Sequence, residues 1–131
     1  MRARLFLSSL GVAATLGVAT AAVAAAGDAG AMVTITDNFR FEPAAVTIRA
    51  GEAVLFHNAS PFVHTVTDDP KLAGQPADAV LPAGAEVFSS GNLEPGADYR
   101  RVLTVPGTYK FFCIPHEGIG MLGEITVLPA P

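Results

Sequence analysis

The sequence has 131 residues, half of them hydrophobic, and a formal net charge of −4 at pH 7. It contains 13 glycines, 10 prolines and a single cysteine. Eight basic residues against twelve acidic ones leave no basic surface for nucleic acid, and one cysteine excludes an internal disulfide. The folded part must therefore be stabilised by its hydrophobic core.

Residues 1–26 have the three parts of a secretory signal peptide. Residues 1–4 are basic, residues 5–26 are uncharged, and residues 22–26 read Ala-Val-Ala-Ala-Ala. We predict cleavage near residues 24–26, leaving residues 27–131 as one exported domain with no membrane span. Since only Arg2 and Arg4 are lost, its net charge becomes −6. We expect this exported domain to lie in a bacterial periplasm. An uncleaved membrane anchor is the alternative, because the uncharged run is long enough to span a bilayer.

The remaining chain alternates hydrophobic and polar residues in short runs separated by turn-forming residues. This pattern predicts an all-β fold, a Greek-key β-sandwich of about eight strands. The segments read as β are residues 32–36, 39–41, 45–49, 52–58, 64–67, 86–89, 99–105, 108–113 and 123–128. Residues 70–84 contain three prolines and two glycines, so we expect a long loop with one helical turn.

Residues 113–121 (Cys-Ile-Pro-His-Glu-Gly-Ile-Gly-Met) place a thiol, an imidazole and a thioether on one short segment. Copper electron-transfer sites use two imidazoles and a thiolate, with a weak, long axial methionine. Cys113 ends a predicted strand, and Pro115 stops that strand because it has no N–H to donate. Gly118 and Gly120 then allow a tight turn that returns Met121 to the same ion.

A second imidazole must come from elsewhere in the chain, and the candidates are His57 and His64. His57 lies inside a predicted strand, on the face opposite the better core residue Phe56, so we expect it to be exposed and without a role. His64 follows the break at Pro61, where the chain enters a new strand at the end of the sandwich. We therefore predict that one copper ion binds to His64, Cys113, His116 and Met121.

Two other kinds of site fit these residues less well. Structural zinc prefers four strong nitrogen, sulfur or oxygen ligands, and a thioether is a poor one. A cysteine nucleophile activated by His116 would need an orienting Asn or Asp, and none is evident. Glu117 has no support as a base and is predicted to be a solvated loop carboxylate. We predict that the protein is not an enzyme.

Residues 107–127 resemble the C-terminal half of plastocyanin, and the Cys-x2-His-x4-Met spacing is also similar to that of pseudoazurin. Upstream matches in the same order cover residues 39–43, 46–51, 54–58 and 64–66. The resemblance to this cupredoxin family implies a soluble one-electron carrier whose blue-copper site cycles between Cu(I) and Cu(II). It departs from plastocyanin at Thr65, where plastocyanin has Asn, and at Phe112, where it typically has Tyr.

The resemblance also implies a monomer that meets a redox protein donor and acceptor transiently. The exposed edge of His116 would lie in an apolar docking patch formed by Phe62, Val63, Pro115, Gly118 and Ile119. Asp68, Asp69 and Asp78 could steer a basic partner, the alternative being ordinary solvated loop charges. The alternative function is that of a periplasmic copper-binding or delivery protein.

Overall fold

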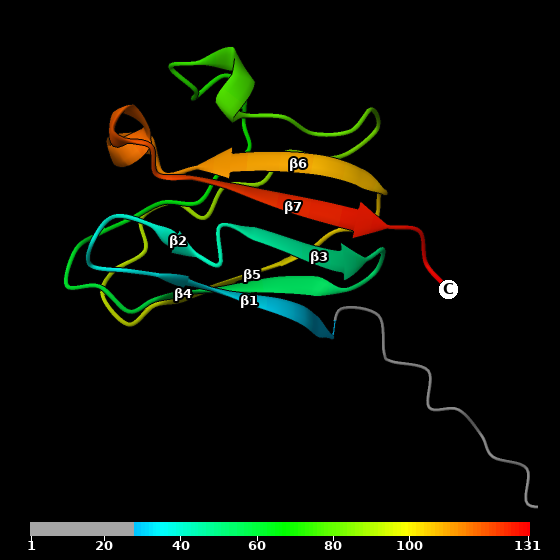
Figure 1. The fold of residues 1–131 in the computed structure, drawn as a ribbon, viewed down its shortest axis with the longest axis horizontal. Coiled ribbons are helices and arrows are strands. Elements are labelled where there is room, and N and C mark those ends of the chain that lie inside the picture. The colour runs from blue at the N-terminus through cyan, green and yellow to red at the C-terminus, as the bar shows by residue number, and fades with distance from the viewer. Residues whose placement is uncertain (1–27) are drawn as a thin grey trace, which may run out of the picture.

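The computed structural model describes residues 28–131, so the predicted signal peptide lies outside the described residues. The chain forms two β-sheets packed face to face (Figure 1). One sheet has the strand order β2-β1-β4-β5 and the other has the order β3-β7-β6. The strands are β1 (Ala29–Ile35), β2 (Phe41–Glu42), β3 (Ala45–Arg49), β4 (Ala53–Asn58), β5 (Asp98–Val102), β6 (Gly107–Phe112) and β7 (Leu122–Leu128).

The predicted all-β sandwich is confirmed, with seven strands in the described residues in place of about eight. The expected strands at residues 64–67 and 86–89 are present only as isolated bridges, such as Thr67 to Ser89. Their backbone bonds are partly replaced by bonds to side chains. The N–H of Thr65 points at Cys113 Sγ (3.4 Å), and the N–H of Val66 donates to Ser90 Oγ (2.8 Å). Residues 64–67 therefore form contacts with the Cys113 side chain in place of a regular β-ladder.

The core is built by the alternation seen in the sequence. On β6, Tyr109 and Phe111 are buried, whereas the intervening Lys110 is exposed. The Phe111 ring meets Phe41 and Phe56 edge-on, with centroids 4.9 and 5.3 Å apart. Each fully buried aromatic side chain contributes roughly 1.5–3 kcal/mol to folding. Since Cys113 follows Phe111 by two residues and is equally buried, the site lies directly against this core.

Residues 70–84 form the expected loop, with one 3-10 turn, η1 (Pro76–Asp78). The loop is fastened to β6 by two backbone hydrogen bonds between Val80 and Lys110, with N–O distances of 2.8 and 3.2 Å. A second 3-10 segment, η2 (Ile114–Ile119), connects β6 to β7 at one end of the sandwich (Figure 1). Among residues 28–131, no helix has the length and apolar character needed to cross a membrane.

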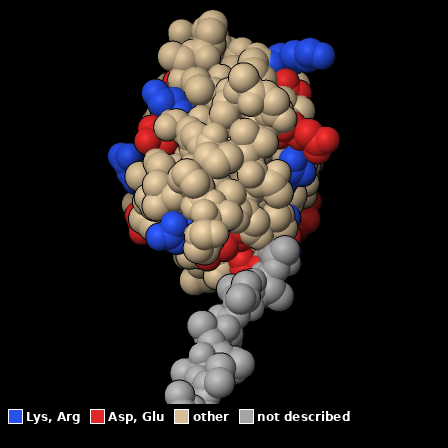
Figure 2. All heavy atoms as spheres, turned by 90° about the vertical axis from the view of Figure 1, so that its right-hand side faces the viewer, with Lys and Arg blue, Asp and Glu red and all other residues tan. Residues whose placement is uncertain are grey.

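Charged residues are scattered over the end of the molecule opposite η2. Figure 2 looks onto this end and shows acidic and basic side chains of both signs around an uncharged centre. Neither sign forms a continuous patch on this face, in agreement with the absence of a basic cluster in the sequence.

Candidate metal centre

The ligand loop, residues 113–121, is shaped by a short set of backbone bonds. The N–H of Cys113 donates to the carbonyl of Met121 (3.2 Å), which brings the two ends of the loop together. Gly120 makes this return possible because it adopts the left-handed conformation (φ 84°), which glycine reaches without steric cost. Cys113 and Met121 are both fully buried. The loop therefore places the thiol and the thioether inside the sandwich, as the sequence predicts.

His64 enters the same place from the segment between β4 and β5. Its backbone pairs with Leu93 through hydrogen bonds of 2.8 and 3.1 Å, and its side chain is fully buried. Nδ1 of His64 lies 3.7 Å from Cys113 Sγ, and Nδ1 of His116 lies 3.3 Å from the same sulfur. Of the two candidate histidines, the structure thus brings His64 to the cysteine.

The spacing of these three donor atoms fits a single metal ion. All three lie within 4.8 Å of one another. Ligand atoms bound at about 2.0–2.3 Å in a trigonal plane are separated by roughly 3.7 Å, close to the two sulfur–nitrogen distances here. Two imidazoles, one thiol and a buried thioether are the donor set of a type 1 copper site, which places His64, Cys113, His116 and Met121 as that site.

The hydroxyl group of Thr65 links the two ligand-bearing segments. The hydroxyl oxygen accepts the N–H of Ile114 (2.8 Å), and the hydroxyl itself lies 3.8 Å from Cys113 Sγ. The backbone N–H of Thr65 also points at that sulfur. Hydrogen bonds of this kind around a metal ligand fix its orientation and tune the metal.

A buried network behind His64 fixes the orientation of the imidazole. Nε2 of His64 lies 2.9 Å from Ser60 Oγ, and the Ser60 hydroxyl donates to Asn58 Oδ1 (2.9 Å). The amide of Asn58 donates in turn to the carbonyls of Phe62 and Leu93 (2.8 and 2.9 Å). With the hydroxyl proton used toward Asn58, His64 carries its own proton on Nε2. Nδ1 is then left with a free lone pair for the metal.

Phe39 is a site residue that the sequence did not reveal. It has a positive φ of 61°, a conformation that costs energy in a bulky residue and that clusters at functional sites. Its ring lies 4.6 Å from the His116 ring, 5.2 Å from Phe62 and 5.9 Å from His64. Phe39 thus packs against both imidazoles. Its backbone conformation indicates a special role, whereas its residue type does not.

Glu117 is also more than the solvated carboxylate expected from the sequence. Its two oxygens accept the backbone N–H groups of Gly74 (2.9 Å) and Gln75 (3.0 Å). These two donors hold the pKa of the Glu117 carboxyl below its usual range. The sequence does not indicate these bonds, because the partners lie more than 40 residues away from Glu117.

Burial sets the protonation of the site when no metal is bound. It raises the pKa of the Cys113 thiol, an effect partly offset by the bonds from Thr65. It also lowers the pKa of His64, and the neighbouring His116 lowers it further. Without a metal, the site therefore favours a neutral thiol and a neutral imidazole, and a bound cation would supply the charge that stabilises the thiolate.

The remaining predicted residues lie at the surface around the ligand loop. Phe62, Val63 and Ile119 are 45, 39 and 66% exposed, and Pro115 and Gly118 are exposed as well. Of the four ligand residues only His116 is not buried. His57, as expected, lies outside the cluster, and its Nδ1 pairs with Asp98 Oδ1 at 2.6 Å on the sheet surface.

One of the three predicted surface acids was placed wrongly. Asp68 is fully buried, and its Oδ1 accepts the N–H of Phe88 (2.7 Å). Burial raises the pKa of Asp68 to about 6. This side chain cannot steer a partner, because it is covered by the segment that carries Phe88.

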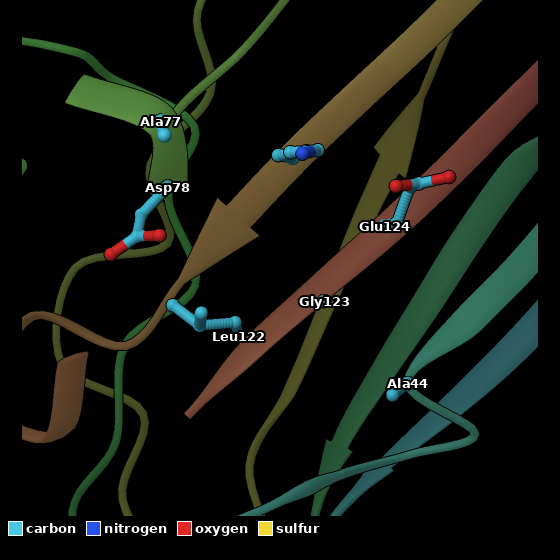
Figure 3. A pocket seen from close by; sticks show the side chains of 7 residues that line it. Ala44, Ala77, Asp78, Leu122, Gly123 and Glu124 are labelled. Atoms are coloured by element: carbon cyan, nitrogen blue, oxygen red, sulfur yellow. The ribbon is translucent and has the colours of Figure 1, made fainter. Parts of the chain in front are cut away.

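Two hollows in the surface lie away from the ligands. One, of about 260 Å³, is shown in Figure 3 and lies between η1, β6 and β7. The other, of about 370 Å³, includes Arg101 and Tyr109. Neither is lined by a ligand residue, so neither supplies a substrate cavity beside the site.

Comparison with known proteins agrees with the geometry. The family described as copper binding proteins, plastocyanin/azurin family, matches residues 28–128. A chloroplastic plastocyanin from Oryza sativa is 40% identical over 136 residues, covering 92% of this chain and 83% of its own. A pseudoazurin from Sinorhizobium has a TM-score of 0.57 at 24% identity, covering 76% of this chain and 75% of its own. A purple cupredoxin from Nitrosopumilus maritimus has a TM-score of 0.60 at 22% identity, with 75 and 99% covered.

A β-sandwich with a His, Cys, His and Met donor set at one end defines a blue-copper protein, or cupredoxin. The family match covers most of the chain and includes both ligand-bearing segments. The chain belongs to the plastocyanin/azurin family of copper-binding proteins, and copper is its cofactor.

Proposed function

We propose that this chain is a one-electron carrier that exchanges electrons with redox protein partners through the exposed edge of His116. A copper ion at the site would supply the Cu(I)/Cu(II) couple. The observation that carries the proposal is the unequal exposure of the four ligand residues, since three are buried and only His116 reaches the surface. An electron would therefore enter and leave by way of this imidazole.

The chain's own residues support transfer without a large change in geometry. Cys113 is held by Thr65 and by the core around Phe111, and His64 is held by Ser60. Donors fixed in this way before the metal arrives keep the site similar in both oxidation states, which is the requirement for fast electron exchange.

We propose the predicted apolar patch of Phe62, Val63, Pro115, Gly118 and Ile119 as the docking surface for both partners. These residues are uncharged and exposed, and three of them lie in η2 together with His116. A small apolar surface suits a weak and short-lived complex, which a carrier needs in order to release its partner. The carrier is proposed to act as an exported monomer, with residues 27–131 as the mature domain.

The proposal is tested by a charge placed in the patch. Ile119→Lys is expected to slow electron exchange with a protein partner at least about tenfold, because an uncompensated charge at the interface must be desolvated. The visible spectrum of the copper form should stay unchanged. Val87→Lys is the matched control, since Val87 is a similarly exposed hydrophobic residue at 48% and lies outside the patch. Equal rates for the two variants would contradict docking at His116.

The same preparation separates a carrier from a copper-delivery protein. A carrier is expected to keep its copper in the presence of a Cu(I) chelator while it cycles rapidly between the two oxidation states. Fast loss of copper to the chelator or to an acceptor protein, together with slow electron exchange, would favour delivery.

A further inference from the structure

The ligand loop has three external supports near His116. The hydroxyl of Thr65 binds the N–H of Ile114, the ring of Phe39 packs on the His116 ring, and the carboxylate of Glu117 binds the 74–75 backbone. The first two supports lie within the metal centre, because Thr65 and Ile114 adjoin ligand residues and the Phe39 ring contacts His116 itself. The third support, Glu117, binds a separate segment, the 70–84 loop, which contributes no ligand to the metal centre.

The Glu117 contact is bidentate and well formed. Oε2 accepts from the N–H of Gly74 at 2.9 Å and Oε1 accepts from the N–H of Gln75 at 3.0 Å. Charge-assisted bonds to two consecutive N–H groups are stronger than neutral ones and restrict the direction of the side chain. Because Glu117 is the direct neighbour of His116, its position limits where the ligand backbone can move.

The 70–84 loop, to which Glu117 binds, is also hydrogen-bonded to β6, the strand that leads to Cys113. Residues 74–75 continue into η1, and the loop then pairs with β6 at Val80 and Lys110. Figure 3 shows η1, with Ala77 and Asp78, beside the end of β6 and next to Leu122 on β7. The 70–84 loop is therefore bound at two places: to β6 through Val80 and Lys110, and to the ligand loop through Glu117.

Gly74 is fitted to this contact. A Cβ atom at this position would lie 3.3 Å from Glu117 Oε2, closer than an ordinary van der Waals contact. A side chain at this position would require the carboxylate to shift by a few tenths of an ångström, which would strain its bonds to the N–H groups. Glycine at this position keeps the backbone within reach of Glu117.

We propose that Glu117 is a positioning residue, a clasp that ties the ligand loop to the 70–84 loop and holds His116 in place whether or not copper is bound. This inference rests on the proposed copper site. His116 is the one ligand residue that is not buried, so it is the side from which copper can leave. By limiting movement of that side, the clasp slows copper loss and keeps the geometry the same in both oxidation states.

The clasp is first tested in the copper-free protein by amide hydrogen exchange. Glu117→Ala removes both acceptors, and Glu117→Gln removes one. Glu124→Gln is the control, because it removes the same charge from β7, at the wall of the hollow in Figure 3, without a bond to the 74–75 backbone. The N–H groups of Gly74 and Gln75 are expected to exchange about tenfold or more faster in Glu117→Ala than in the control. Equal exchange in the two variants would overturn the proposal.

Copper loss is measured second, in the loaded protein with a Cu(I) chelator. Glu117→Ala is expected to release copper about tenfold faster than Glu124→Gln, in the range found when groups that orient metal ligands are removed. Unchanged release with intact blue colour would overturn the clasp and leave the copper site standing. A wild-type protein without blue colour would instead overturn the proposed function.

A double-mutant cycle distinguishes the clasp from a general loss of stability. Gly74→Ala should speed copper release in the wild-type background, by less than Glu117→Ala does, and have little further effect in Glu117→Ala, because both changes act on the same contact. Additive effects of the two changes would show that they act independently, contrary to the proposal.

Discussion

The two segments that bring ligands to the metal centre are built in opposite ways. Residues 64–68 are buried at every position, whereas in η2 (Ile114–Ile119) no residue is buried. Behind His64 lies a complete hydrogen-bond network through Ser60 and Asn58. His116 is held by its own short turn, by the Phe39 ring and by its neighbour Glu117. The first segment holds its ligand rigidly, and the second leaves its ligand partly exposed, which is where we propose that a partner docks.

This contrast explains how one site can be both fixed and reachable. A fully buried set of ligands would shield the metal from its partners, and a fully exposed set would not hold the donors at their distances. The two requirements are met by different histidines: His64 is fixed and His116 is reachable. The two histidine segments are connected at Cys113, through the bonds that Thr65 makes to Cys113 Sγ and to the N–H of Ile114.

The largest expected effect comes from deleting each imidazole in turn. Both His64→Gly and His116→Gly should lose the blue copper spectrum. Added free imidazole should restore colour to His116→Gly, because that position opens to solvent. His64→Gly should not recover, since its cavity is closed and its Ser60 partner would be left without a donor. Visible absorption with increasing imidazole measures the difference, and equal rescue would contradict the assigned burial.

The buried Asp68 is expected to lower the free energy of unfolding at neutral pH. The folded pKa of about 6 is above the ordinary value of 3.8, so the folded state holds more protons between these pH values. The unfolding free energy should therefore fall as pH rises from about 4 to 6, by at most roughly 3 kcal/mol from this group, and then level off. Below pH 3.8 this cost is absent, because the carboxyl is protonated in both states.

Asp68→Asn keeps the acceptor for Phe88 and removes the titration. It should be more stable than the wild type at pH 7, with the advantage disappearing toward pH 4, as measured by urea unfolding at several pH values. Asp37→Asn, at an exposed position, is the control. A stability difference that does not change with pH would show that Asp68 is not a buried titrating group.

Ser60→Ala should weaken the hold on His64. Without the hydroxyl, the imidazole loses its acceptor on Nε2, and we expect copper affinity to drop by about tenfold. Competition with a chelator measures the affinity. Ser89→Ala, at an exposed serine, should leave it unchanged. Identical affinities in the two variants would mean that the network does not orient His64.

The smallest effect is expected at Thr65, where the two segments touch. Thr65→Val removes the hydroxyl that lies 3.8 Å from Cys113 Sγ and binds the N–H of Ile114. Fewer bonds to the thiolate should lower the reduction potential by roughly 20–40 mV, equivalent to about 0.5–1 kcal/mol for one electron. Voltammetry measures this shift. Thr65→Ser, which keeps the hydroxyl, should retain the potential, and a potential unaffected in both variants would exclude a role for the side chain.

The ligand set could be predicted from the sequence because three of its members lie within nine residues. The choice of His64 over His57 also followed from local information, namely strand parity and the break at Pro61. A strand was predicted at residues 64–67, whereas the structure has only isolated bridges there, at His64 and Thr67. Side chains such as Ser90 take over backbone bonds of this segment, and such tertiary contacts leave no periodic signal.

Other features depend on contacts that no local pattern encodes. Phe39 matters through a positive φ, which its residue type disfavours. Glu117 matters through two N–H groups in a distant loop. Asp68 sits in a polar, proline-bounded stretch that is typical of exposed loops, yet it is covered by the segment around Phe88. Each was missed because its role is set by the tertiary structure.

The most direct test of the copper site is the visible spectrum of purified protein titrated with Cu(II). We expect one equivalent of copper per chain and an intense blue colour from thiolate-to-copper charge transfer, with Cys113→Ser abolishing the colour. A copper-loaded wild-type protein without this absorption, or a Cys113→Ser variant that retains it, would contradict the assignment of Cys113 as the ligand at the centre of the site.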